Sequence, residues 1–294
     1  MKKIAIATLL AASAMVATAQ VTLTGKVSEF ADNTKAGAVS KNSLVTDPTS
    51  NITISATEKM AGGMSARLIL DTSLAANDPT GGSATKLGDR QSTIGLANQI
   101  GSIDVGRNLH SHFLAITNND SFGTLYGSIA GDVHNLRGLR VSNGTFFALA
   151  PVAGVTATYD RTAAGTGTEA SSYSASASVM GVNAVVAQYT QGADKSTVYG
   201  ASTKLAGMQV SYTHSDDKGV GAHTGDLFGV TKAYGAVTAK ASYGKTNTAV
   251  KAYALGADYN LSKRTALGVA YRNVDAAGTA HDVKQVGVGV THRF

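Results

Sequence analysis

The chain of 294 residues contains no cysteine and no tryptophan, and only three prolines. Without cysteine it cannot be one of the small exported domains that disulfide bonds hold together, so ordinary burial or contact with lipid must stabilise it. No hydrophobic run reaches the ~20 residues that a membrane-spanning helix needs. The net charge of +6 is small and the basic residues are scattered, which excludes a nucleic-acid partner. The chain also lacks a glycine-rich phosphate-binding loop.

The N-terminus has the three parts of a secretory signal peptide. Two lysines open the chain, an apolar run follows over residues 4–16, and Ala17-Thr18-Ala19 supplies small residues for cleavage. This order predicts a signal peptide over residues 1–19. The protein is therefore expected to be exported, with a single mature domain over residues 20–294.

Apolar and polar residues alternate through most of the remaining chain. The segment 51–58, for example, has Ile52, Ile54 and Ala56 at every second position, with threonine and serine between them. Because neighbouring side chains of a strand point to opposite faces, this pattern predicts strands with one apolar and one polar face. The sixteen predicted strands cover residues 20–28, 51–58, 64–72, 90–97, 101–107, 138–149, 153–161, 171–180, 182–190, 196–204, 207–214, 224–233, 235–244, 249–259, 264–273 and 283–294.

The connections between the predicted strands differ in kind. Those after every second strand are short turns, such as Met180-Gly181 and Tyr234-Gly235, whereas the others include the long segments 28–50, 74–88 and 109–136. This asymmetry is typical of transmembrane barrels. A closed barrel also satisfies its backbone hydrogen bonds within a bilayer, and one of sixteen strands encloses a water-filled channel. The sequence therefore predicts an all-β fold: a 16-stranded antiparallel transmembrane β-barrel with short periplasmic turns and long outer loops.

Two further patterns indicate which face meets lipid. The last strand places three valines and the terminal Phe294 on one face, and we expect this strand to close the barrel against Val21 and Leu23 of the first. Five alternate strands also end in tyrosine, and amphipathic rings are favoured where a membrane meets water. These tyrosines are therefore expected to form one outward ring; they are Tyr159, Tyr189, Tyr212, Tyr243 and Tyr271.

Four stretches resemble a known family. They are the hairpin Ala56-Thr57-Glu58-Lys59-Met60-Ala61-Gly62-Gly63-Met64-Ser65-Ala66, the segment from Arg90 to Arg107, the strand 153–159 and the ending Gly-Val-Thr-His-Arg-Phe. In this order, behind a signal peptide, they are similar to the general porins of Gram-negative bacteria, in the trimeric type of β-proteobacteria. The resemblance implies a homotrimer in the outer membrane, in contact with its lipid, that lets small hydrophilic solutes and ions diffuse passively.

The same resemblance implies two special segments. The third outer loop of the family folds inward and narrows the pore, and residues 109–136 break the alternation where that loop should lie. The terminal aromatic residue of the family serves as the signal by which the outer-membrane assembly machinery recognises the chain. Phe294 is expected to have that role here.

Strand parity predicts which charged side chains face the pore. The predicted pore-lining residues are Lys26, Arg67, Asp71, Asp104, Lys240, Asp258 and Arg272, with Lys204 and Arg293 nearer the periplasmic mouth. Basic residues outnumber acidic ones in this set, and basic linings favour anions, so we expect a weak anion preference. A cluster facing the inward loop is predicted from Arg90, Arg107, Arg137 and Arg140, with Asp120 on the loop.

Other functions compete with the channel. His110, His112 and His134 lack the cysteine or carboxylate partners that would complete a metal site, so no metal and no cofactor is expected. Ser111, beside His112, raises the alternative of an outer-membrane lipase, although no strained nucleophile motif accompanies it. A secreted β-rich adhesin is the third alternative, and its repeat should be more regular than the spacing of the five tyrosines. We therefore expect a channel and no enzyme.

Overall fold

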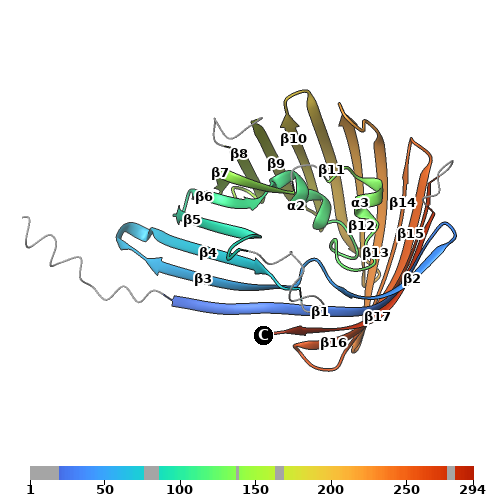
Figure 1. The fold of residues 1–294 in the computed structure, drawn as a ribbon. Helices are drawn as coiled ribbons and strands as arrows, with labels where there is room; N and C mark the ends of the chain where they lie inside the picture. The colour runs from blue at the N-terminus through green and yellow to red at the C-terminus, as the bar shows by residue number, and fades with distance from the viewer. Residues whose placement is uncertain (1–19, 76–85, 137–138, 163–168, 277–281) are drawn as a thin grey trace, which may run out of the picture.

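The computed structural model describes residues 20–75, 86–136, 139–162, 169–276 and 282–294. Its strands form one antiparallel sheet that closes on itself as a barrel (Figure 1). No helix of the described residues is long and apolar enough to span a membrane. The predicted signal peptide, residues 1–19, lies outside the described residues. The strands are β1 (Gln20–Ala36), β2 (Val39–Thr46), β3 (Asn51–Lys59), β4 (Ser65–Ser73), β5 (Gln91–Ala97), β6 (Gly101–Leu109), β7 (Arg140–Leu149), β8 (Val155–Thr162), β9 (Ala170–Val179), β10 (Val182–Gln191), β11 (Asp194–Leu205), β12 (Met208–Lys218), β13 (Thr224–Tyr234), β14 (Val237–Thr246), β15 (Val250–Asn260), β16 (Thr265–Ala276) and β17 (Val283–Arg293).

These seventeen segments fill sixteen positions in the wall, because β2 and β3 lie end to end beside the long strand β1. The expected polar connection over 28–50 is wrong in its first part, since residues 28–36 continue β1 and a hairpin leads into β2. Polar residues occupy the outward positions here and hide the alternation. Asn33 donates to the side-chain oxygen of Asn42 at 2.6 Å, and the hydroxyl of Thr46 donates to Glu29. The ladder of backbone hydrogen bonds holds the strand without an apolar face.

Closure of the barrel differs in register from the prediction. Strand β17 pairs with residues 26–36 of β1, from Lys26 opposite Arg293 to Ala36 opposite Val283. The expected partners Val21 and Leu23 pair instead with β3. The chain end extends the ladder by one step, because Phe294 exchanges two 3.0 Å backbone hydrogen bonds with Gly25. A side chain at residue 25 would overlap the ring of Phe294, so the position of the terminal aromatic ring requires glycine there.

The two ends of the barrel are distinct, and we call them the turn end and the loop end. The turn end has both the C-terminus and short turns such as the 3-10 helix η1 (Ala61–Gly63) between β3 and β4. The loop end has the longer connections, including residues 110–139 between β6 and β7. Near the loop end, aromatic residues form a cross-strand row on the outer face; its members are Tyr212, Phe228, Tyr243 and Tyr253. We call this row the aromatic belt.

Four of the five tyrosines expected to form an outward ring do point outward, but Tyr189 does not. Its side chain is only 2% exposed and lies inside the barrel, where its ring meets His110 edge-on at 5.0 Å. Tyr189 shares a face of β10 with the buried Ala187, because residues two apart point the same way. The prediction of a five-membered ring is therefore wrong at this position.

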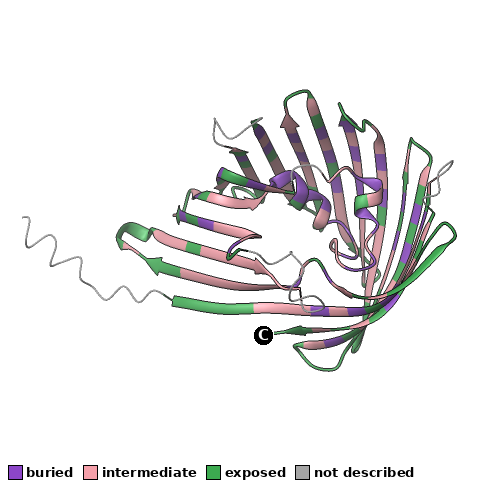
Figure 2. Cartoon of the chain, in the orientation of Figure 1, coloured by how far each residue is buried: buried purple, intermediate pink, exposed green. Residues whose placement is uncertain are grey.

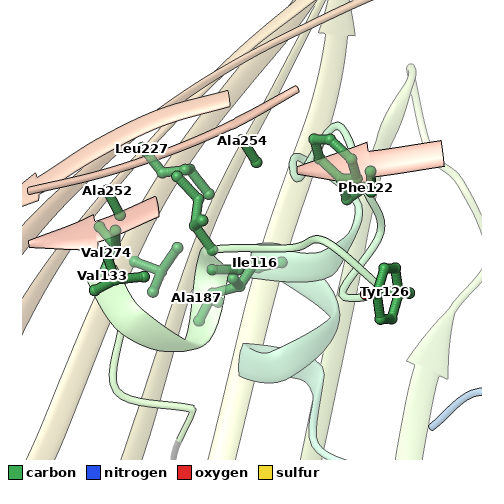
Figure 3. Packing of buried hydrophobic residues seen from close by; sticks show 14 of the residues in the cluster. Ile116, Phe122, Tyr126, Val133, Ala187, Leu227, Ala252, Ala254 and Val274 are labelled. Carbon is green, nitrogen blue, oxygen red and sulfur yellow. The ribbon is translucent and has the colours of Figure 1, made fainter. Parts of the chain in front are cut away.

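Residues 110–136, which we call the inward loop, turn back into the barrel (Figure 1). The loop contains two short helices, α2 (Ser111–Thr117), which packs on β9, β10 and β11, and α3 (Ala130–Val133), which packs on β13, β14 and β15. Buried side chains lie on these helices and on the facing strands, whereas β3 and β4 are largely half-buried (Figure 2). The hydrophobic core thus lies between the inward loop and one side of the wall (Figure 3).

Candidate functional site

The start of the inward loop is fixed by one buried carboxylate on β8. Asp160 is 2% exposed, and its oxygens accept hydrogen bonds from the amide of Ser111 at 2.9 Å and the hydroxyl of Ser111 at 2.7 Å. The Nδ1 atom of His110 pairs with the same carboxylate. Three donors on one buried carboxylate fix the start of α2 in place of a helix cap. This arrangement also uses the hydroxyl of Ser111, which contacts Asp160 and Ser172 and does not face a histidine as a lipase nucleophile would.

Two more histidines anchor the loop to hydroxyl groups of the wall. His112 Nε2 lies 2.8 Å from the hydroxyl of Ser196. His134, just after α3, lies between Ser215 at 2.9 Å and Thr213 at 2.8 Å. Burial lowers the pKa of His134 to about 3, so this ring is neutral at pH 7. No group of three or more His, Cys, Asp or Glu side chains within the described ranges could hold a metal ion.

Asp120, the predicted acid of the constriction, organises the loop itself. Its oxygens accept from the amides of Phe122 at 3.1 Å and Thr124 at 2.7 Å, and from the hydroxyl of Ser128 at 2.6 Å. The residue is only 8% exposed. Its carboxylate therefore closes the turn at 120–124 and presents little charge to the pore.

Tyr126 fixes the far side of the loop against β1. Its ring stacks on Phe30 with centroids 4.1 Å apart, and its hydroxyl donates to Asp32. Its amide donates to Asp47 at 2.7 Å. Burial raises the pKa of Tyr126, and the contact with Asp32 raises it further, so the hydroxyl stays protonated as a donor. The inward loop is thus held at β1 as well as at the strands under α2 and α3.

Glycines on the inner face of the wall make room for the loop. A Cβ atom at residue 256 would lie 2.8 Å from the ring of Phe122, and one at residue 200 would lie 2.8 Å from Asn119. At four more glycines a Cβ atom would collide with Ser121, Val133 or Tyr126 of the loop; these are Gly225, Gly229, Gly244 and Gly287. Because almost any larger residue at these positions would collide with the loop, the inner face of β11–β17 is shaped to receive it.

The wall from β4 to β7 presents four arginines, which we call the arginine wall: Arg67, Arg90, Arg107 and Arg140. Two of them are paired. Arg67 Nε donates to Asp104 at 2.7 Å, and Arg90 Nε donates to Asp71 at 2.9 Å. Asp71 also accepts from Asn51 at 2.6 Å and Thr53 at 2.9 Å. Each of these predicted residues does face the inside of the barrel, but their charges largely cancel.

The other two arginines have no carboxylate partner among the described residues. Arg107 Nε donates to the carbonyl oxygen of Asp89 at 2.6 Å, and Arg140 Nε donates to the carbonyl oxygen of Arg90 at 3.0 Å. Arg140 lies in the electrostatic field of both Arg90 and Arg107. Carbonyl oxygens satisfy hydrogen bonds without cancelling a charge, so these two guanidinium groups provide the net positive potential at this site. Arg137, the fourth member of the predicted cluster, lies outside the described residues.

Of the remaining predicted pore-lining cations, Lys26, Lys240 and Arg272 are paired with carboxylates, whereas Lys204 and Arg293 at the turn end have no carboxylate within 4.0 Å among the described residues. Lys26 lies 3.5 Å from Asp47, Lys240 lies 2.6 Å from Asp258, and Arg272 lies 3.1 Å from Asp132 on the inward loop. Burial raises the pKa of Asp132, while Arg272 acts in the opposite direction. Sequence reasoning missed Asp47, Asp132 and Asp160, because the first two lie outside the predicted strands and Asp160 carries no local signal of its partners.

The closed barrel, the polar inner face and a loop that partly fills the lumen define an outer-membrane channel. The chain belongs to the Gram-negative porins, because the model of that family matches residues 6–294. The family and the fold point to a channel rather than an enzyme. A search of curated protein sequences finds no match.

Solved structures share the fold at low sequence identity. The anion-selective porin from Comamonas acidovorans is 21% identical, with a TM-score of 0.81 over 94% of this chain and 100% of that chain. OmpF of Salmonella typhi is 15% identical, with a TM-score of 0.74 over 94% of this chain and 98% of that one. OmpT of Vibrio cholerae, in a trimer form, is 10% identical, with a TM-score of 0.69 over 94% and 99% of the two chains.

Proposed function

We propose that this porin is a passive, weakly anion-preferring pore for small hydrophilic solutes and ions. The observation that supports the preference is the arginine wall, where Arg107 and Arg140 have no carboxylate partner among the described residues. Lys26, Arg67, Arg90, Lys240 and Arg272 are each paired with a carboxylate, which makes the preference weak. The structural neighbour from Comamonas acidovorans is described as anion-selective, which agrees with this proposal.

Reconstitution in a planar lipid bilayer tests both parts of the proposal. We expect stepwise increases in current and, under a salt gradient, a reversal potential of the sign that anion flow produces. Absence of current steps from correctly folded protein would overturn the pore. A reversal potential of the opposite sign would overturn the anion preference alone. Adding neutral sugars of increasing size would then give the size limit for solutes.

We further propose that the protein is a homotrimer whose subunits meet through β1–β6. Residues 20–109 contain a single aromatic residue, Phe30, and it points inward. Apart from the polar part of β1 and β2 near the loop end, the outer face of these strands is apolar, with Leu23 56% exposed and Ile94 60% exposed, yet it lacks the tyrosines that mark contact with a membrane interface. An apolar wall without this belt fits protein contacts better than lipid. One of the structural neighbours is described as a trimer.

Phe294 is proposed as the signal that the outer-membrane assembly machinery recognises. Its ring lies over Gly25 at the seam between β1 and β17, 40% exposed on the outer face at the turn end. We place the turn end in the periplasm, where that machinery would meet the chain end, and the loop end at the cell exterior.

A further inference from the structure

A cavity of about 410 Å³ lies inside the barrel, between α2 of the inward loop and the wall from β8 to β11. Its wall side carries five hydroxyl groups, from Thr156, Thr158, Ser174, Ser176 and Ser202, and three asparagines add amide groups. No charged side chain lines the cavity among the described residues. This part of the lumen therefore offers many neutral hydrogen-bonding groups to a solute but no opposite charge.

The hydroxyl groups of the wall are arranged in cross-strand pairs. Thr156 of β8 lies directly opposite Ser176 of β9, and their hydroxyl oxygens are 2.6 Å apart. Thr158 and Ser174 form the next pair, at 2.7 Å. Within such a pair only one of the two hydroxyl hydrogens is used, so each pair keeps a donor and free lone pairs for a solute. Because a hydroxyl group rotates to donate or to accept, these pairs suit a solute whose own groups do both.

Two apolar side chains lie among these polar groups. Leu114 of α2 is 39% exposed although its neighbours Phe113 and Ala115 are buried, and it lines the cavity from the side of the loop. Val185 of β10 lines it from the wall. An apolar side chain held in a water-filled lumen favours a solute that has an apolar surface of its own. A sugar ring has both parts, since its C–H groups form apolar faces and its hydroxyl groups surround them.

We propose that this cavity binds a neutral sugar, about the size of a monosaccharide, during its passage through the pore. Ligand sites typically measure about 300–1,000 Å³ and combine apolar contacts with a few placed polar groups, as this cavity does. An ionic solute would lose water here without finding an opposite charge, which costs free energy. A sugar instead replaces its contacts with water by the hydroxyl and amide groups of the lining.

This inference rests on the proposed pore and deepens it, since a solute reaches the cavity only through the lumen. The test measures binding without any current, by saturation-transfer NMR on protein in a detergent that has no sugar headgroup. D-Glucose is compared with triethylene glycol, a neutral solute of similar size that has hydroxyl groups only at its ends. We expect the glucose signal to saturate with concentration, and the signal of triethylene glycol to stay weak and to rise without saturation.

Two changes to the cavity should weaken glucose binding. The double variant Thr158→Val/Ser174→Ala removes one hydroxyl pair, and because both partners are replaced together no hydroxyl group is left unpaired, so the fold should be unaffected. The dissociation constant for glucose should rise about fivefold, which corresponds to the loss of one hydrogen bond. Leu114→Asn keeps the size of the side chain but removes its apolar contact, so it should also raise this constant.

The matched control is Thr231→Val/Thr238→Val, which removes two hydroxyl groups from the inner face of β13 and β14, away from the cavity. Its dissociation constant for glucose should equal that of the native protein. Absence of saturation, equal binding of the two solutes, an unchanged constant in Thr158→Val/Ser174→Ala or an equal loss in the control would each overturn the proposal. Current steps in a planar bilayer, measured on the same preparations, show separately whether the pore itself is present.

Discussion

The two sides of the pore lining are built from different residues. From β8 to β17 the inner face has many glycine, alanine and hydroxyl residues that receive the inward loop, and its buried hydrophobic residues belong to that contact. From β4 to β7 the barrel carries the arginine wall, and in the described residues its four arginines form their hydrogen bonds and ion pairs with one another's strands and loops and not with the inward loop. One side thus fixes the width of the channel, and the other sets its charge. Substitutions should be able to change one property without the other.

The largest effect is expected from Asp160→Ala, on the side that holds the loop. The substitution leaves His110 and the amide of Ser111 buried without their acceptor. A buried donor left without its acceptor costs about 1–3 kcal/mol. We expect a lower temperature of unfolding together with increased noise in the open-channel current, as α2 comes loose.

Glu169→Ala is the matched control for this prediction. Glu169 pairs with Arg161 at 3.0 Å, but both side chains are about half exposed, and surface pairs of this kind contribute little. If Asp160→Ala has the same open-channel noise and the same temperature of unfolding as the native protein, this carboxylate does not hold the loop.

A smaller effect, confined to selectivity, is expected at the arginine wall. Replacing Arg107 and Arg140 by glutamine removes two cations that have no carboxylate partner among the described residues. By Coulomb's law a unit charge about 8 Å from an ion in water attracts an anion by about 0.5 kcal/mol and repels a cation by the same amount, so the anion-to-cation permeability ratio should fall by up to about fivefold for each cation removed. The measurement is the reversal potential at low salt, where screening is weakest.

The double variant Arg67→Gln/Asp104→Asn tests whether the permeability ratio depends on the net charge of the wall or on the number of arginines in it. It removes a pair whose charges cancel, so the permeability ratio should stay close to that of the native protein. A loss as large as that of the first variant would mean that pairing does not neutralise this wall, and the comparison between the two sides would lose its basis.

The same contrast explains what the sequence could and could not predict. The alternation of side chains is local, so the positions of most strands and the inward orientation of residues such as Arg67 and Lys240 could be predicted from it. The pairing of those charges depends on carboxylates far along the chain, such as Asp47 and Asp132, whose positions are fixed only when the loops fold. Where the outward positions are polar, as at Asn33, alternation disappears and no strand is predicted.

Tyr189 and the three histidines illustrate the same limit inside the barrel. Their sequence neighbourhood predicts an interfacial tyrosine and ordinary loop histidines, whereas all four side chains are buried where the inward loop meets the wall. The face of a strand that is polar at most positions becomes a packing surface where the loop covers it. No local pattern distinguishes these two uses of one face.

The last expected effect is a graded one: it comes from pH and acts on the loop side alone. His134 has a pKa of about 3 when anchored, against 6.5 for a solvated histidine, the condition that a released loop approaches. Above pH 6.5 both states are neutral and the anchored loop has its full stability. As the pH falls from 6.5 towards 3, the released state gains a proton that the anchored state does not bind, so anchoring weakens progressively.

Open-channel noise should therefore rise as the pH is lowered from about 7 to about 4. The substitution His134→Asn keeps a polar side chain at this position and removes the titrating ring, so its noise should change less over the same range. His112, His214 and His223 lower the pKa of His134 and Asp226 raises it, so a residual slope from these neighbours is expected in the variant. If the native protein and His134→Asn respond identically, the acid sensitivity of the loop does not arise at this histidine. In either case, the selectivity set by Arg107 and Arg140 should not change over this range, because guanidinium groups stay charged.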